Sequence, residues 1–231
     1  MKPIDKDRMV FSWLAGAWDD YLNALPLLLP VILIQTALAA VSFYIVWRYH
    51  SLLAAAPYML FIMTPLATGA NLVYIKLARG GGARLRDLFS AFPIYPRALA
   101  VSVGLGLLTM GGAVMFILPG IVLYLAYAFS EYAVVDRRTG IRESFRLSAS
   151  ITYGWKTRLF TIFSLVMLVH IAVPDIFVIS GPLTDPAASL DLKPWTVVAA
   201  VLKTLVFLPW LAMAMARAYN TLSAGLRAEQ A

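Results

Sequence analysis

Long apolar stretches, separated by short polar segments, make up most of this chain. Six of them reach or approach the roughly 20 residues that an α-helix needs to cross the hydrocarbon core of a bilayer. They lie at about 22–47, 56–76, 98–118, 119–136, 159–180 and 195–217. Because the third and fourth stretches meet at Pro119-Gly120, they are predicted to form a tight helical hairpin.

Three polar segments that precede spans are predicted to be short amphipathic helices, at about 8–20, 84–95 and 139–155. In each, an aromatic residue stands four positions before the leucine that opens the span; these residues are Tyr21, Tyr95 and Trp155. Helices of this kind lie in the headgroup plane of a bilayer. The helical spacing is clearest in the second segment, where Leu85, Leu88, Phe89 and Phe92 share one face and Arg84, Arg86, Asp87 and Ser90 face away.

These patterns predict an all-α integral membrane protein that forms a single membrane domain over residues 1–231. It has six transmembrane helices, short amphipathic interfacial helices on the cytoplasmic side and a weak threefold repeat of interfacial helix and two-span hairpin. The composition agrees, since 61% of the residues are hydrophobic and 13% are charged, against roughly 45–50% and 25% in soluble domains. A soluble globule and a disordered chain are therefore excluded.

The basic residues predict the orientation. Arg48 and Lys193 fall on one side of the predicted membrane, Lys203 lies within a span, and the other 16 of the 19 basic residues fall on the opposite side. By the positive-inside rule both termini then face the cytoplasm. The net charge of +7 is interpreted as topology signal and attraction to anionic phospholipid headgroups rather than as binding of nucleic acid. The first residues mix acids and bases, which is not typical of a cleavable signal peptide.

Four ionisable residues fall inside the predicted spans, namely Glu131, His170, Asp175 and Lys203. Burial of such groups is costly, so each is a candidate for function. Lys203 is expected to extend along its stem to meet Asp175, beside a helix kinked at Pro174. This cluster is either a structural ion pair, the interpretation we favour, or a polar site that opens outward for a solute, a proton or a lipid headgroup. Glu131 is expected to pair with an arginine near the cytoplasmic side.

No catalytic or nucleotide-binding motif is present in the sequence, and paired carboxylates at catalytic spacing are absent. The chain has no cysteine and two histidines, so neither a metal site nor a cofactor is predicted. In span three, Ala98, Ser102 and Gly106 recur at four-residue intervals, which indicates close helix packing. Irregular or polar points in the bundle are marked by Gln35, Asn71, Pro30, Pro65 and Pro209.

Two passages, Phe116–Phe160 and Gly80–Leu99, resemble the membrane-domain family found fused to some bacterial glycerophosphodiester phosphodiesterases. They also resemble related, uncharacterised six-span bacterial inner-membrane proteins. The likeness rests on the Pro119-Gly120 hairpin, an aromatic fourth span that ends at Asp136, and a cytoplasmic helix with Glu143, Ser144, Ser148 and Gly154. It implies a protein of the bacterial cytoplasmic membrane. The soluble phosphodiesterase barrel is missing from this sequence, so the enzyme activity is not carried over.

The leading hypothesis is a non-enzymatic inner-membrane protein with an accessory or organising role, which binds lipid or a partner protein at its cytoplasmic face. The expected contact residues are Arg84, Arg86, Arg138, Arg142, Arg146 and Trp155. The alternative is a small solute transporter that uses the polar cluster of spans five and six. A lipid-modifying intramembrane enzyme is a third class, and it would require acidic or histidine side chains facing one cavity.

Overall fold

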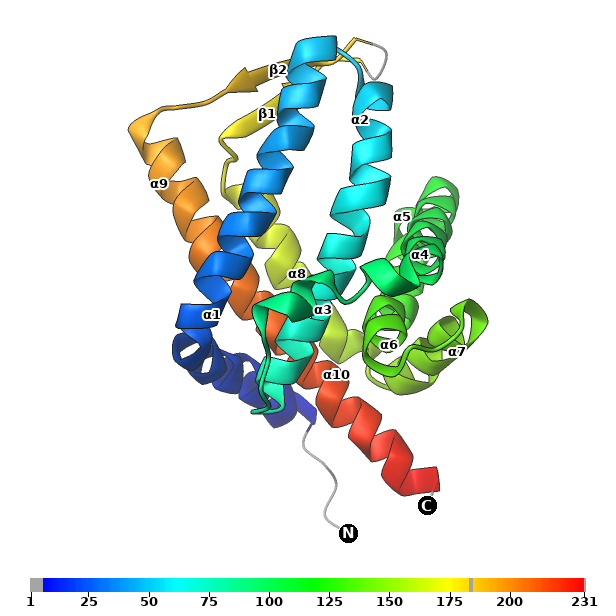
Figure 1. Cartoon of the computed structure of the whole chain (residues 1–231). Coiled ribbons are helices and arrows are strands. Elements are labelled where there is room, and N and C mark those ends of the chain that lie inside the picture. Colours follow the sequence, from blue (N-terminus) through cyan, green and yellow to red (C-terminus); the bar gives the residue numbers. More distant parts are fainter. Residues whose placement is uncertain (1–5, 183–184, 231) are drawn as a thin grey trace.

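Helices form the frame of the molecule, which a computed structural model describes over residues 6–182 and 185–230 (Figure 1). They are α1 (Lys6–Tyr49), α2 (Leu52–Tyr58), α3 (Thr64–Ala78), α4 (Tyr95–Met115), α5 (Ile117–Tyr127), α6 (Ser130–Arg137), α7 (Ile141–Thr152), α8 (Lys156–Ala172), α9 (Pro194–Leu202) and α10 (Leu208–Gln230). Two π-helical segments, η1 (Met59–Met63) and η4 (Lys203–Phe207), join α2 to α3 and α9 to α10 without a break. Strands β1 (Phe177–Ser180) and β2 (Ala187–Leu190) pair antiparallel, with Phe177 opposite Leu190.

Five helical stretches are long and apolar enough to cross a membrane, and the bent pair α7–α8 makes up to six. The expected class, an all-α membrane protein, is therefore confirmed. Figure 1 shows the β1–β2 hairpin and the α1–α2 turn at one end of the bundle, which we call the hairpin end. The start of α1 and the end of α10 lie at the opposite end, which we call the terminal end. Of the basic residues used to predict orientation, Lys2 lies outside the described residues.

Two predicted span boundaries are wrong. Span five was expected to continue to residue 180, but α8 ends at Ala172 and the chain continues into β1. Pro174 has no N–H to bond the carbonyl of His170, so the helix stops there instead of kinking. The turn between spans three and four lies at Phe116, whose backbone is extended, rather than at Pro119-Gly120. The predicted hairpin itself is present, because a Cβ on Gly120 would come within 3.0 Å of Ala113 in α4, so only glycine permits this approach.

The three interfacial segments differ from one another in structure. Segment 8–20 is not a separate helix but the beginning of α1, and it packs onto the bundle through the buried Trp13 and Ala17. Segment 84–95 is not an α-helix, since it contains two short 3-10 turns, Leu85–Phe89 and Phe92–Ile94. The predicted polar face also fails there, because Asp87 is buried and binds Lys76 at 2.7 Å. The repeat is thus not regular.

The third segment forms α7 as expected, and a row of small hydroxyl side chains on this helix faces inward. Ser144, Ser148 and Thr152 are fully buried on one face of the helix. The Ser148 hydroxyl accepts a hydrogen bond from the Phe129 N–H at 3.1 Å and donates one to the Ala126 carbonyl at 3.0 Å. These two backbone groups lie at the break between α5 and α6, so α7 supplies the bonds that a continuous helix would have made itself.

Ion pairs hold the terminal end together. Arg79, just after α3, makes two hydrogen bonds to the Asp136 carboxylate of α6, at 2.6 and 2.7 Å. The hydrogen bond to Asp136 raises the pKa of Arg79 above its ordinary value. Tyr219 of α10 also donates to Asp136, at 3.0 Å. Arg217 of α10 binds Asp20 of α1 in the same two-pronged manner, so charged contacts join four helices at this end.

Replacing Ser148 by alanine is expected to lower the free energy of unfolding by about 1–3 kcal/mol, because the Phe129 N–H would be left buried without an acceptor. Ser150→Ala is the matched control, since Ser150 is exposed and its hydroxyl bonds the carbonyl of Arg146 in its own helix. Unfolding in mixed micelles of increasing SDS content measures both values. Equal loss of stability in the two variants would contradict the proposed role of Ser148.

Candidate functional site

The ammonium group of Lys203 lies inside the bundle and forms the ion pair expected from the sequence. It contacts both carboxylate oxygens of Asp175 at 2.9 Å and the Val173 carbonyl at 3.1 Å. The Lys203 side chain is 2% exposed, whereas the Asp175 side chain is 60% exposed. The pair therefore ties the chain after α8 to the start of η4, with the lysine covered and the carboxylate open on one side.

His170 and Glu131 make other contacts. The Nδ1 atom of His170 lies 2.9 Å from the carbonyl of Val166, one turn back in α8, and the residue is exposed. Glu131 was expected to meet an arginine, and this expectation is wrong: the Ser102 hydroxyl of α4 donates to its carboxylate at 2.6 Å. The four intramembrane residues therefore do not form a single cluster, and among them only Asp175 and Lys203 are paired.

Both π-helical segments end two residues before a proline, Pro65 for η1 and Pro209 for η4. A proline cannot donate to the carbonyl four residues earlier, and its ring pushes that carbonyl aside. At Pro209 this carbonyl belongs to Leu205, and the Tyr21 hydroxyl of α1 donates to it at 2.8 Å. Widened turns of this kind occur frequently at functional sites.

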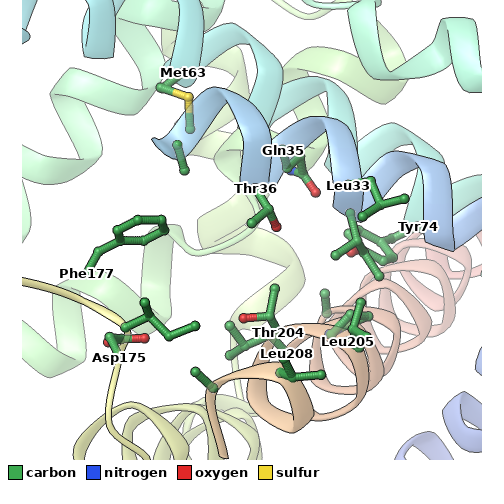
Figure 2. A pocket seen from close by; sticks show the side chains of 17 residues that line it. Leu33, Gln35, Thr36, Met63, Tyr74, Asp175, Phe177, Thr204, Leu205 and Leu208 are labelled. Atoms are coloured by element: carbon green, nitrogen blue, oxygen red, sulfur yellow. The ribbon is translucent and has the colours of Figure 1, made fainter. Parts of the chain in front are cut away.

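A cavity of about 580 Å³ lies between α1 and the η4–α10 helix. Met63 of η1 and both Thr204 and Leu205 of η4 contribute to its wall, so the two widened turns border one space. Figure 2 shows Thr36 and Thr204 reaching into this space from α1 and η4, with Asp175 and Tyr74 at opposite ends. The volume is within the range of roughly 300–1,000 Å³ that small-molecule sites occupy.

The wall of this cavity is mostly apolar. Its polar side chains are Gln35, Thr36, Thr204, Tyr74 and Asp175. The remaining lining residues are Ile32, Leu33, Ala39, Met63, Ile176, Phe177, Ala200, Val201, Leu205, Leu208, Pro209 and Ala212. Such a surface can hold a hydrocarbon chain. It offers one charged group, the partly exposed carboxylate of Asp175, near the hairpin end. It offers no arrangement of acid, base and nucleophile among the described lining residues.

The residues predicted to contact headgroups are mostly on the surface of the molecule. The five arginines Arg84, Arg86, Arg138, Arg142 and Arg146 are exposed. Trp155 is different, because it is half-buried and its ring lies 5.8 Å from the ring of Trp13 in α1. Trp155 therefore contributes to packing at the turn between α7 and α8. The arginines are exposed in two places: Arg84 and Arg86 lie in the segment that packs on α3 and α1, and the other three lie on or just before α7.

The sequence did not indicate the cavity itself. Gln35 and Pro209 stand out in the sequence as irregular points within spans, and both line the cavity. Thr36 and Thr204 carry no such signal, since isolated threonines are common in transmembrane helices. The prolines inside apolar spans, Pro65 and Pro209, are the sequence feature that could have directed attention to η1 and η4.

Comparison with known proteins gives one distant relation. A UPF0259 membrane protein of Pectobacterium carotovorum subsp. carotovorum (strain PC1) is 28% identical to this chain over 103 residues. The match covers 44% of this chain and 41% of that protein, so the chain spans less than half of the length of its relative. No protein-family model and no solved structure matches the chain. The relation supports a membrane location and an uncharacterised bacterial membrane family, and it does not extend to glycerophosphodiester phosphodiesterases.

Proposed function

We propose that this protein is a non-enzymatic lipid-binding protein with an accessory or organising role in a bacterial cytoplasmic membrane, both termini facing the cytoplasm. The observation that carries the proposal is the cavity between α1 and α10. It is open and mostly apolar. Most of its lining residues belong to helical stretches that are long and apolar enough to cross a bilayer. The molecules that surround such segments are lipids, so an acyl chain is the occupant whose chemistry fits this wall.

The direction of the bound lipid follows from the two ends of the cavity. Asp175 lies next to the β1–β2 hairpin, at the end where the helices turn back, and Tyr74 lies deeper in the bundle. A lipid would therefore place its polar part near Asp175, Thr36 and Thr204, and extend its chain toward Tyr74. Threonine hydroxyls beside an ester or a headgroup can satisfy hydrogen bonds that hydrocarbon cannot.

Solute transport is the weaker alternative because the polar groups of its proposed site are already bonded to other groups of the protein. Three hydrogen bonds fix the buried Lys203 ammonium, and the Nδ1 atom of His170 contacts the carbonyl of Val166 in its own helix. A site for a polar solute needs groups that are free to exchange partners. Asp175 has this property on its exposed side, and that side opens to the apolar cavity.

Filling the cavity should displace the lipid. Ala39 lines it from α1, and Ala39→Phe is expected to remove the most strongly retained lipid molecule from the purified protein. Ala37→Phe is the matched control, because Ala37 is exposed and does not line the cavity. Native mass spectrometry, with stepwise removal of bound lipid, compares the two. The same lipid adducts in both variants would refute the assignment of the cavity.

The exposed arginines of α7 are expected to bind anionic headgroups. Changing Arg142 and Arg146 together to glutamine should lower the preference for phosphatidylglycerol over phosphatidylcholine by roughly thirtyfold, since each surface charge contributes about 1 kcal/mol and two contribute about 2 kcal/mol. The measurement is the ratio of the two lipids retained by the protein from mixed micelles. Arg48→Gln, near the hairpin end, should leave this ratio unchanged; an equal effect there would argue against a localised basic surface.

Replacing Asp175 and replacing Lys203 should lower the free energy of unfolding by different amounts. Asp175→Asn leaves a buried ammonium without its counter-ion and is expected to lower the free energy of unfolding by about 1–3 kcal/mol, less than for a fully buried pair because Asp175 is largely exposed. Lys203→Met leaves a carboxylate that water can reach, so its cost should be smaller. SDS unfolding of both variants and of the double variant tests the order, and the reverse order would contradict a structural role for the pair.

A further inference from the structure

A second cavity, of about 460 Å³, surrounds the carboxylate of Glu131. Its wall is formed by Asn71 of α3, by Ser102, Leu105, Gly106, Thr109 and Met110 of α4, by Tyr124, Ala128, Glu131 and Tyr132 of the α5–α6 region, and by Met215 of α10. It shares no lining residue with the cavity between α1 and α10. The two cavities are therefore separate sites.

The groups around the Glu131 carboxylate act as hydrogen-bond donors to it. The Ser102 hydroxyl donates to a carboxylate oxygen of Glu131 at 2.6 Å. The Asn71 side chain lines the same cavity and offers a further amide donor. Thr68 of α3 lies 3.5 Å from the Ser102 hydroxyl and completes a short polar chain. These contacts stabilise a negative charge, but they do not neutralise it.

The positive charge that would balance Glu131 is missing from the cavity. Among the described residues that line it, Glu131 is the one carboxylate, and none is lysine, arginine or histidine. The ionised form of a half-buried carboxylate within a span is costly without a counter-charge, so the group takes up a proton unless a cation binds beside it. A ligand that carries one positive charge would remove this cost.

The remaining wall indicates what kind of cation fits. The rings of Tyr124 and Tyr132 both border the space, and aromatic rings attract alkylated ammonium groups through their faces. Leu105, Met110 and Met215 add apolar surface suited to alkyl substituents. An inorganic ion would leave most of the 460 Å³ empty, whereas an organic cation would use the carboxylate, the rings and the apolar wall together.

We propose that the Glu131 cavity is a binding site for an organic cation, a protonated or quaternary amine with small alkyl substituents. The ammonium group pairs with Glu131, and the alkyl groups lie against Tyr124 and Tyr132. The hydroxyl groups of Ser102 and Thr109 donate to Glu131 and to the Leu105 carbonyl, so their oxygens can accept a hydrogen bond from a polar tail. Access is from the side of α4, where Met110 is 68% exposed.

Gly106 makes this proposal testable without disturbing the fold. Gly106 lines the cavity, and a Cβ there would meet nothing within 4 Å, so a larger side chain can be introduced at the cavity wall without a clash. Gly106→Leu should therefore block the site, and it also replaces glycine with a better helix former. Glu131→Gln removes the charge while keeping the shape. Glu143→Gln, on the exposed side of α7, is the charge-matched control.

The experiment is equilibrium binding of radiolabelled choline to the purified full chain in an uncharged maltoside detergent. We expect saturable binding that weakens at least about tenfold in Glu131→Gln and Gly106→Leu and is unchanged in Glu143→Gln, a loss of about 1.4 kcal/mol or more. Unlabelled choline should compete, and its uncharged analogue 3,3-dimethylbutan-1-ol should not.

Three results would overturn the proposal. They are absence of saturable choline binding to the wild-type protein, undiminished binding to folded Gly106→Leu, and competition by the uncharged analogue as strong as by choline itself. Displacement of choline by Na⁺ as readily as by unlabelled choline would assign the site to an inorganic cation and would equally refute the organic one. Circular dichroism of each variant establishes that the helices are formed.

Discussion

Within a bilayer, every backbone N–H and C=O group has to find its partner inside the protein, because hydrocarbon offers none. This chain interrupts its helices at several points within or beside the membrane-spanning stretches, and at three of them a named side chain supplies the missing bond. Ser148 bonds the Phe129 N–H and the Ala126 carbonyl at the α5–α6 break. Tyr21 bonds the Leu205 carbonyl released by Pro209, and Lys203 bonds the Val173 carbonyl after α8.

The same interruptions create the two cavities. The widened turns η1 and η4 border the space between α1 and α10, and the α5–α6 break precedes Glu131 directly. A bundle of uninterrupted helices would pack these regions closed through regular side-chain interdigitation. The irregular backbone thus loses helical hydrogen bonds, which side chains of other elements replace. It also leaves the two cavities, in which we propose that a lipid chain and an organic cation bind.

Properties that depend on long periodic patterns, or on the length of a flexible side chain, could be predicted from the sequence. The membrane class, α7 and the pairing of Lys203 with Asp175 belong here, the last because a long lysine stem tolerates errors in helix position. Sequence reasoning failed where one local interaction decides. Segment 84–95 forms 3-10 turns because Asp87 bonds the Arg84 N–H and Lys76. Glu131 has a serine partner rather than an arginine because the register between α4 and α6, which no single-helix pattern contains, places Ser102 beside it.

The early end of α8 has a consequence for the bilayer itself. With 17 residues and a rise of about 1.5 Å per residue, α8 is roughly 26 Å long, a few ångströms short of a typical hydrocarbon core of about 30 Å. Beyond its end, the exposed Phe177, Val178 and Ile179 of β1 continue an apolar surface on an extended strand. The helical part of the wall that lipids meet beside α8 is nevertheless shorter than the one that the 44-residue α1 offers. Hydrophobic mismatch at this one side of the bundle is expected to thin the membrane locally, so the protein would favour thin or compressible bilayer regions.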